Sequence, residues 1–345
     1  MKPLLRFSVF ILITVISVTS GAAKKNVKSE SAPVDKGFST INRQTAEAHI
    51  EFLASDLLEG REAGYPSGQI AAQYLESYLK TLGLEPWNGE SYRQPFEAYR
   101  KERQKKGRYT VHPDSIAEIT RDLAYQRLPL TNVIAKIEGK NPDEYVVIGS
   151  HFDHLGKDPL LDRDKIYNGA DDNASGVAAL LQIARAFVAS GQQPERTVIF
   201  ALWDGEEKGL LGSEYFMQTW ENPEKIKGYL NFDMIGRNND ENRPEHVVYF
   251  FTASHPVFGD WLKNDVETRG LNLQPDYRAW DNPVGGSDNA SFAKRGIPII
   301  WYHTDAHPDY HQPTDHADRI NYSKTVDITR AAFLNLWNLA NLPTY

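Results

Sequence analysis

A stretch near the middle of the sequence, residues 145–188, restricts the possible folds more than any other. It begins with the apolar run Tyr145–Ile148, which has the length of a buried strand. It ends with residues 177–188, whose apolar side chains recur at three- and four-residue steps, as on one face of a helix. Between them lie histidines, aspartates and glycines. In open α/β sheets, ligands bind outside the carboxyl ends of the strands, so this order predicts a binding site.

The loop between this strand and helix carries several carboxylates, among them Asp153, Asp171 and Asp172. Burying carboxylates at a strand end is costly unless a cation neutralises them, and a divalent metal ion is the simplest such cation. The chain has no cysteine, which excludes disulfides, thiolate catalysis and cysteine-ligated zinc. Histidine, aspartate and glutamate remain as the candidate ligands.

The rest of the chain alternates predicted strands and helices. This alternation indicates an α/β domain with a mainly parallel central sheet covered by helices on both faces. Residues 98–128 show no clear pattern, and residues 238–286 have loop composition that we expect at the rim of the site. The predicted strands are 131–137, 144–149, 197–203, 229–232, 247–252 and 297–302, and the predicted helices are 45–58, 67–82, 177–188, 210–220, 256–270 and 325–341.

The N-terminal residues have the composition of a secretory signal. Lys2 and Arg6 precede an apolar run, and small residues follow up to Ala23. We therefore expect a signal peptide at 1–23, a linker at 24–40 and one domain at 41–345. The run is short for a membrane span, so we expect a secreted or periplasmic protein without stable membrane association after leader removal.

The charge of the chain bears on its partners. The net charge is −8, which argues against nucleic acid as the main partner. The charged run at 100–106 is interpreted as a solvated surface.

Four predicted strands end beside acidic residues or histidines. One such residue means little, but four strands converging on one sheet edge indicate a metal site. Oxygen and imidazole ligands suit zinc, manganese or cobalt, and two ions about 3.5–4 Å apart need a carboxylate between them. The residues that follow the strands are His151, Asp153, Asp204, Glu206, Glu207, Asp233, His303, His307 and His311.

Five motifs in this order resemble those of metallopeptidase family 28. That family includes bacterial dizinc aminopeptidases, aminopeptidase Y and glutamate carboxypeptidase II. The resemblance covers roughly residues 45–340 and implies a dizinc peptidase domain of the zinc-peptidase type over 41–345. The motifs are His151–Gly156, Gly169–Gly176, Asp204–Glu207, Asn231–Met234 and Tyr310–Asp315.

The resemblance implies a role for each ligand. His151 and Asp233 would hold one zinc ion, and Glu207 and His311 the other. Asp172 would bridge the two.

The resemblance also implies three catalytic residues. Glu206 would be the general base, and Asp153 would orient the imidazole of His151. Tyr310 resembles the tyrosine that stabilises the oxyanion in this family.

Some assignments stay open at this point. Asp171 competes with Asp172 for the bridge, and His154 is interpreted as structural support. In the motif around Ser287, Asn289 stands where the family often has a histidine, which puts the role of that loop in doubt. Three further histidines compete with His311, namely His303, His307 and His316.

The function implied is that of a secreted dizinc aminopeptidase acting on peptides. A carboxypeptidase or dipeptidase, a glutaminyl cyclase and a non-enzymatic receptor-like ectodomain are the alternatives. Trp280, Trp301 and Tyr302 line a substrate pocket or belong to the core. The sequence indicates neither side-chain preference nor oligomeric state.

Overall fold

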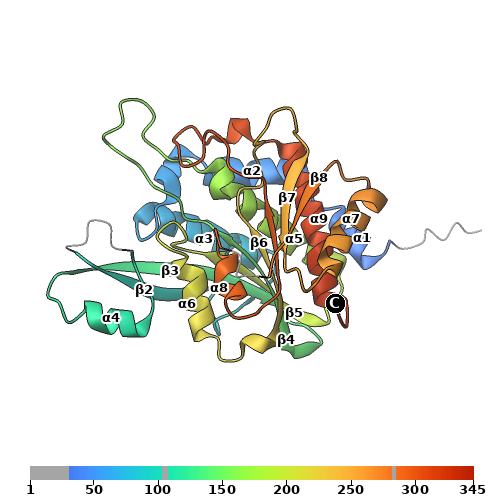
Figure 1. Cartoon of the computed structure of the whole chain (residues 1–345), viewed down its shortest axis with the longest axis horizontal. Helices are drawn as coiled ribbons and strands as arrows, with labels where there is room; N and C mark the ends of the chain where they lie inside the picture. The colour runs from blue at the N-terminus through green and yellow to red at the C-terminus, as the bar shows by residue number, and fades with distance from the viewer. Residues whose placement is uncertain (1–30, 103–107, 282–284) are drawn as a thin grey trace, which may run out of the picture. The chain divides into compact units, whose positions relative to one another are not determined.

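The computed structural model describes residues 31–102, 108–281 and 285–345 (Figure 1). The predicted leader at 1–23 and part of the charged run at 100–106 lie outside these residues. From Ala32 to Tyr345 the chain packs as one unit. Among the described residues, no helix is long and apolar enough to cross a membrane.

The described strands form one nine-stranded sheet in the order β1-β3-β5-β4-β6-β9-β7-β8, with β2 paired to β3. The strands are β1 Glu85–Pro86, β2 Arg93–Lys101, β3 Tyr125–Ile137, β4 Asn141–His151, β5 Arg196–Trp203, β6 Ile226–Phe232, β7 His246–Phe251, β8 Gln274–Ala279 and β9 Ile299–His303.

Four parallel strands, β5, β4, β6 and β9, form the centre of the sheet. Toward the edges, β3 and β7 run antiparallel to their inner neighbours. Every residue of β5 is buried, as expected for a strand covered on both faces. The predicted α/β class is confirmed, with antiparallel strands added outside a parallel centre.

Helices cover both faces of the sheet. α5 and α9 pack on one face against β4, β5 and β6, while α6 and α8 pack on the other. The helical elements are α1 Pro33–Phe38, α2 Arg43–Leu53, η1 Asp56–Arg61, α3 Pro66–Thr81, α4 Pro113–Ile119, η2 Ala170–Ser175, α5 Gly176–Ser190, α6 Leu211–Thr219, η3 Pro223–Lys225, α7 Val257–Arg269, α8 Asn289–Ala293, η4 Ala317–Arg319 and α9 Tyr322–Asn341.

The two core layers follow from the alternation of side chains along the strands. Val146 and Ile148 of β4 face the layer under α5 and α9, whereas Val147 between them faces the layer under α6 and α8. The carboxyl ends of the central strands are therefore held between two packed layers.

The first predicted helix is shorter than expected. α2 ends at Leu53, and the chain turns through η1, where Glu59, Gly60 and Arg61 have positive φ angles. This turn places the Arg61 side chain inside the protein. The second helix matches its prediction, and Gly83 follows its end with a φ of 73°.

The regions without a clear sequence pattern contain regular structure. β2 pairs with β3 along nine residues, and Figure 1 shows the two strands running side by side toward α4. Within the stretch predicted as a linker, Pro33–Phe38 form α1, which contacts α5 and α9. Within 238–286, β8 adds an edge strand.

Candidate metal centre

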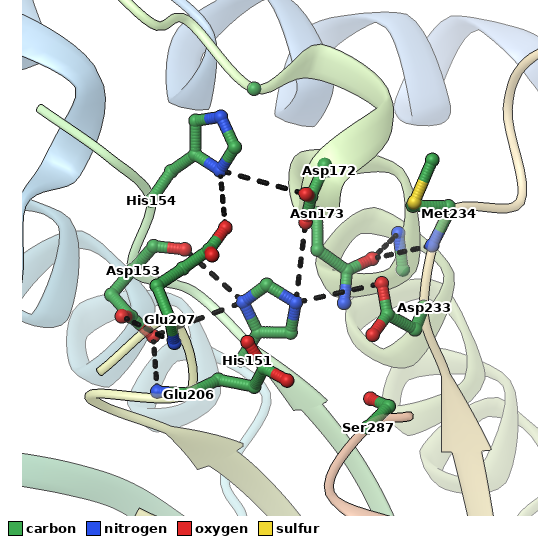
Figure 2. Close-up of polar contacts among 12 residues, drawn as sticks. His151, Asp153, His154, Asp172, Asn173, Glu206, Glu207, Asp233, Met234 and Ser287 are labelled. Atoms are coloured by element: carbon green, nitrogen blue, oxygen red, sulfur yellow. Dashed lines mark hydrogen bonds and ion pairs between the residues drawn. The ribbon is translucent and has the colours of Figure 1, made fainter. Parts of the chain in front are cut away.

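The predicted site residues meet at the carboxyl edge of the central strands. His151 is the last residue of β4, Glu207 lies in the turn after β5, and Asp233 follows β6. Asp172 lies in η2, which precedes α5, and His311 lies in the loop after β9. Elements from across the domain therefore bring all five predicted ligands into one cluster. Figure 2 shows four of them, His151, Asp172, Glu207 and Asp233.

The first group consists of His151, Asp172 and Asp233, which the structure brings within reach of one metal ion. His151 Nε2 lies 3.3 Å from Asp172 Oδ1 and 3.6 Å from Asp233 Oδ1. Two ligand atoms on one tetrahedral zinc ion lie about 3.3 Å apart, given metal–ligand distances near 2 Å. The donor atoms and their spacing both fit zinc.

The second group centres on His311. Its Nε2 lies 3.2 Å from Asp172 Oδ2 and 3.3 Å from Glu207 Oε2. Asp172 thus directs one carboxylate oxygen to each group, which is the arrangement that a bridging ligand requires. The peptide bond after Asp172 is cis.

His154 also lies in this part of the site. Its Nδ1 is 2.8 Å from Glu207 Oε1 and 3.8 Å from Asp172 Oδ2 (Figure 2). By proximity alone, His154, Asp172 and Glu207 also form a group able to hold a metal ion. The sequence pattern did not indicate this closeness.

Asp153 makes contacts different from those expected. His151 Nδ1 lies 3.1 Å from the main-chain carbonyl oxygen of Asp153, whereas the carboxylate oxygen is 3.8 Å away. The Asp153 carboxylate instead accepts hydrogen bonds from the main-chain N–H groups of Glu206 and Glu207. It therefore braces the turn that carries both glutamates.

The alternative candidates lie outside the two groups. Asp171 accepts hydrogen bonds from Gly236 N and Ser175 Oγ, and its other oxygen lies 3.0 Å from His307 Nε2. His316 contacts Asp164. These contacts account for Asp171, His307 and His316 without a metal ion.

His303 occupies a different position. Its Nδ1 donates to the main-chain carbonyl of Asp233 at 2.6 Å, and the residue lines the cavity beside the metal groups.

The charges around Glu206 influence its protonation. Burial raises its pKa well above the ordinary range, and the negative charges of Asp233, Asp288 and Glu207 add to this effect, against the influence of His151. A carboxylate with a raised pKa is suited to accept a proton near neutral pH.

The pKa of the carboxylate at the bridging position shifts in the opposite direction, downward. Burial alone would raise the pKa of Asp172, but the charge of His154 and the hydrogen bonds to His151 and His311 lower it well below its usual range. For Glu207, burial and Asp172 raise the pKa, and the contacts with His154 and His311 outweigh them to lower it. Both carboxylates are therefore available as anionic ligands.

The cavity beside the two groups has a volume of about 240 Å³. Met234, Trp301 and Ala306 form its apolar wall, and Tyr310 stacks on His311 at its mouth. Of the three aromatic residues considered for a substrate pocket, Trp301 lines this cavity, while Tyr302 is buried in the core.

The loop around Ser287 lies beside the cavity, which Gly286 lines. Asn231 Nδ2 donates to Ser287 Oγ at 3.0 Å, and both residues are buried. Neighbouring Asp288 is also buried. Burial raises its pKa to about 7.

Arg61 is a supporting residue that the sequence did not reveal. Its guanidinium is buried and donates to the main-chain carbonyls of Leu53, Phe152, Asn168 and Gly169. These bonds join the loop after β4 to the loop before η2. Nothing in the sequence around Arg61, which lies between two predicted helices, predicts that its side chain is buried beside the site.

Comparisons with known proteins agree with this arrangement. A profile of Peptidase family M28 matches residues 132–335. Leupeptin-inactivating enzyme 1 of Streptomyces exfoliatus is 35% identical over 170 residues, which cover 49% of this chain and 34% of that enzyme. For the curated relatives considered, the matched part makes up 23% to 57% of their own length.

Two solved structures share the fold at low sequence identity. The zinc aminopeptidase BSAP from Bacillus subtilis superposes with a TM-score of 0.66 at 14% identity, covering 88% of this chain and 97% of that one. A glutaminyl cyclase from Fimbriiglobus ruber gives a TM-score of 0.64 at 16% identity, covering 86% and 95%. At these identities, the likeness concerns the fold.

Proposed function

This chain belongs to Peptidase family M28, and on that basis we propose that it is an aminopeptidase that uses two zinc ions to hydrolyse the N-terminal residue from peptides. The observation that carries the proposal is the bridging geometry of Asp172, with His151 and Asp233 on one side and His311 and Glu207 on the other. Zinc bound there would polarise the substrate carbonyl and lower the pKa of a water molecule.

The residues of the chain supply the proton transfers. Glu206 lines the cavity together with both histidine ligands, and its raised pKa suits it to accept a proton from the attacking water and deliver it to the leaving amine. Tyr310 is half-exposed at the cavity mouth, and we assign its hydroxyl to the developing oxyanion. Asp153 holds the turn that carries Glu206.

The dimensions and charge of the cavity support action at a free amino end. The cavity holds about 240 Å³ and includes Met234 and Trp301 in its lining, a size that suits one residue rather than the middle of a peptide. Glu206 and Asp233 give its wall a negative character that favours a substrate ammonium group.

The test compares peptides with free and acetylated amino ends. We expect zinc-reconstituted protein to release the N-terminal residue from the free peptide alone, and a chelator to abolish the release. Release of the C-terminal residue from acetylated peptides would identify a carboxypeptidase instead, and cyclisation of N-terminal glutamine would identify a cyclase.

We also propose that residues 1–23 are a cleaved leader, that 41–345 are the catalytic domain, and that the enzyme acts outside the cytoplasm. The support is the composition of residues 1–23, with basic residues before an apolar run and small residues after it. Mass spectrometry of the exported protein checks the cleavage position.

A further inference from the structure

His154 contacts the second metal group at a distance that defines its role. Its Nδ1 lies 2.8 Å from Glu207 Oε1. That distance is typical of a charge-assisted hydrogen bond, whereas two ligand atoms on one tetrahedral zinc ion are separated by about 3.3 Å. The distance to Asp172 Oδ2, 3.8 Å, exceeds both values. His154 therefore has the geometry of a hydrogen-bond donor.

The two oxygens of Glu207 face different histidines. Oε1 receives His154, while Oε2 lies 3.3 Å from His311 Nε2. This division leaves Oε2 directed at the metal group and holds Oε1 outside it. A carboxylate gripped in this way cannot rotate freely about its last bond.

The imidazole of His154 is itself held in place. Its main-chain N–H donates to the carbonyl of Arg61. Its ring lies against the backbone at Gly169, where an added Cβ would come within 2.6 Å of the ring. Figure 2 shows Nδ1 turned toward Glu207 and the far edge of the ring turned away, and the buried Nε2 has no hydrogen-bond partner among the described residues.

We propose that His154 is a positioning residue for the second zinc ion, whose Nδ1–H fixes Glu207 so that Oε2 alone is presented to the metal. The inference rests on the proposed function, which supplies the two ions. The proposal gives different roles to two histidines that proximity alone cannot tell apart. His311 binds the metal, and His154 orients a ligand.

The chain offers substitutions that separate these roles. His154→Asn retains an N–H donor near the position of Nδ1, while His154→Gln moves the donor outward and His154→Ala removes it. His311→Ala removes the ligand. His316→Ala is the matched control, because His316 contacts Asp164 in a loop beyond both metal groups. Zinc stoichiometry and the two Kd values are measured on metal-free protein by competition with a chelating dye, without reference to activity.

We expect His154→Ala to bind two zinc ions at saturation, with the second bound about 10- to 100-fold more weakly, as is usual when a residue supporting a metal ligand is lost. His154→Asn should recover most of this loss and His154→Gln should not. His311→Ala should saturate at one ion, and His316→Ala should match the wild type. Circular dichroism identifies any variant that does not fold. If His154→Ala does not fold, the comparison of His154→Asn with His154→Gln tests the proposal.

Two results would overturn the proposal. If His154→Asn saturates at one ion, His154 is itself a ligand. If folded His154→Ala binds both ions as tightly as the wild type, His154 does not position Glu207. If His154→Ala does not fold, the same result for His154→Gln leads to the same conclusion. A wild-type protein that binds fewer than two zinc ions would instead contradict the proposed function, so the two failures are distinguishable.

Discussion

At the scale of single residues, Glu206 and Glu207 show how position separates identical side chains. Glu206 lines the cavity, whereas Glu207 contacts His154 and His311. Their pKa values move in opposite directions, upward for Glu206 and downward for Glu207. One carboxylate is prepared to take a proton and the other to remain an anion.

This contrast predicts different effects of the same substitution. Glu206→Gln cannot accept a proton, so it should keep both zinc ions and lose on the order of 10²- to 10⁴-fold in kcat. Glu207→Gln replaces an anionic ligand with a neutral one, so it should weaken zinc binding, and excess zinc should restore part of the activity. Zinc content and kcat are measured for both variants. Loss of metal in Glu206→Gln with retention in Glu207→Gln would reverse the roles.

The sequence predicts which residues come together at this scale, because four of the five motifs lie at or after the end of a strand and the fifth precedes α5. It does not predict the contact between His154 and Glu207, which are 53 residues apart and meet only when β4 and β5 pair. The sequence also does not predict the contact between His151 and the main-chain carbonyl of Asp153, because every residue type has such a carbonyl.

At the scale of elements, Arg61 links the turn in η1 to the segment that follows His151 and to the loop that precedes Asp172. Arg196 offers a close parallel at the start of β5. It is also buried, and it donates to the carbonyls of Leu339, Leu342 and Pro343 near the end of α9. The two arginines therefore do similar structural work in different places.

We expect Arg61→Lys and Arg196→Lys to lower the free energy of unfolding by comparable amounts, on the order of 2–4 kcal/mol, because lysine leaves buried carbonyls without a donor. Only Arg61→Lys should also weaken zinc binding, by about 10-fold or more, since Arg61 holds the segments next to His151 and Asp172. Urea unfolding and zinc competition measure the two effects. Equal zinc affinity in both variants would show that Arg61 stabilises the fold without organising the metal site.

Elements with strong periodicity are predicted best. The central strands and α5 follow the expected ranges closely because their apolar patterns record burial on the sheet. β2 and α4 were not predicted because they bury few side chains, Phe96 and Ala98 in β2 and Ile119 in α4, which is too few to impose a period. α2 ends at Leu53 because Ser55 is extended and its hydroxyl accepts a hydrogen bond from Leu57 N–H at the start of η1, a local cap that the apolar pattern does not record.

At the scale of the whole molecule, acidic side chains gather at one edge of the sheet, and apolar layers cover its two faces. Asp153, Asp172, Asp233 and Glu207 come from separate segments, and the folded state holds them together against their mutual repulsion. The unfolded chain does not. The proposed zinc ions would therefore bind the folded state preferentially and stabilise it, by about 2.7 kcal/mol for each site when free zinc is 100 times Kd.

Removing the metal should accordingly lower Tm, and the effect should depend on pH in a definite direction. In the metal-free protein, burial alone would lower the pKa of His311, but its contacts with Asp172 and Glu207 raise it to about 10. The carboxylates around His151 likewise outweigh burial and raise its pKa well above the ordinary value. His311 is thus protonated near pH 7, and the raised pKa of His151 favours the same charged form, so zinc must displace protons when it binds.

Histidine protonation and zinc binding change the stability of the fold in opposite directions as the pH rises. A raised histidine pKa stabilises the metal-free fold at pH values below about 6.5, and this contribution is lost as the pH rises through the folded value near 10 for His311. Zinc binding, in contrast, strengthens as the pH rises. The difference in Tm between zinc-loaded and chelator-treated protein should therefore widen between pH 6 and pH 8, which scanning calorimetry measures. Asp172→Asn, which weakens the shared ligand, should show a smaller difference at each pH, and a difference that narrows with rising pH would contradict the protonated state assigned to the two histidines.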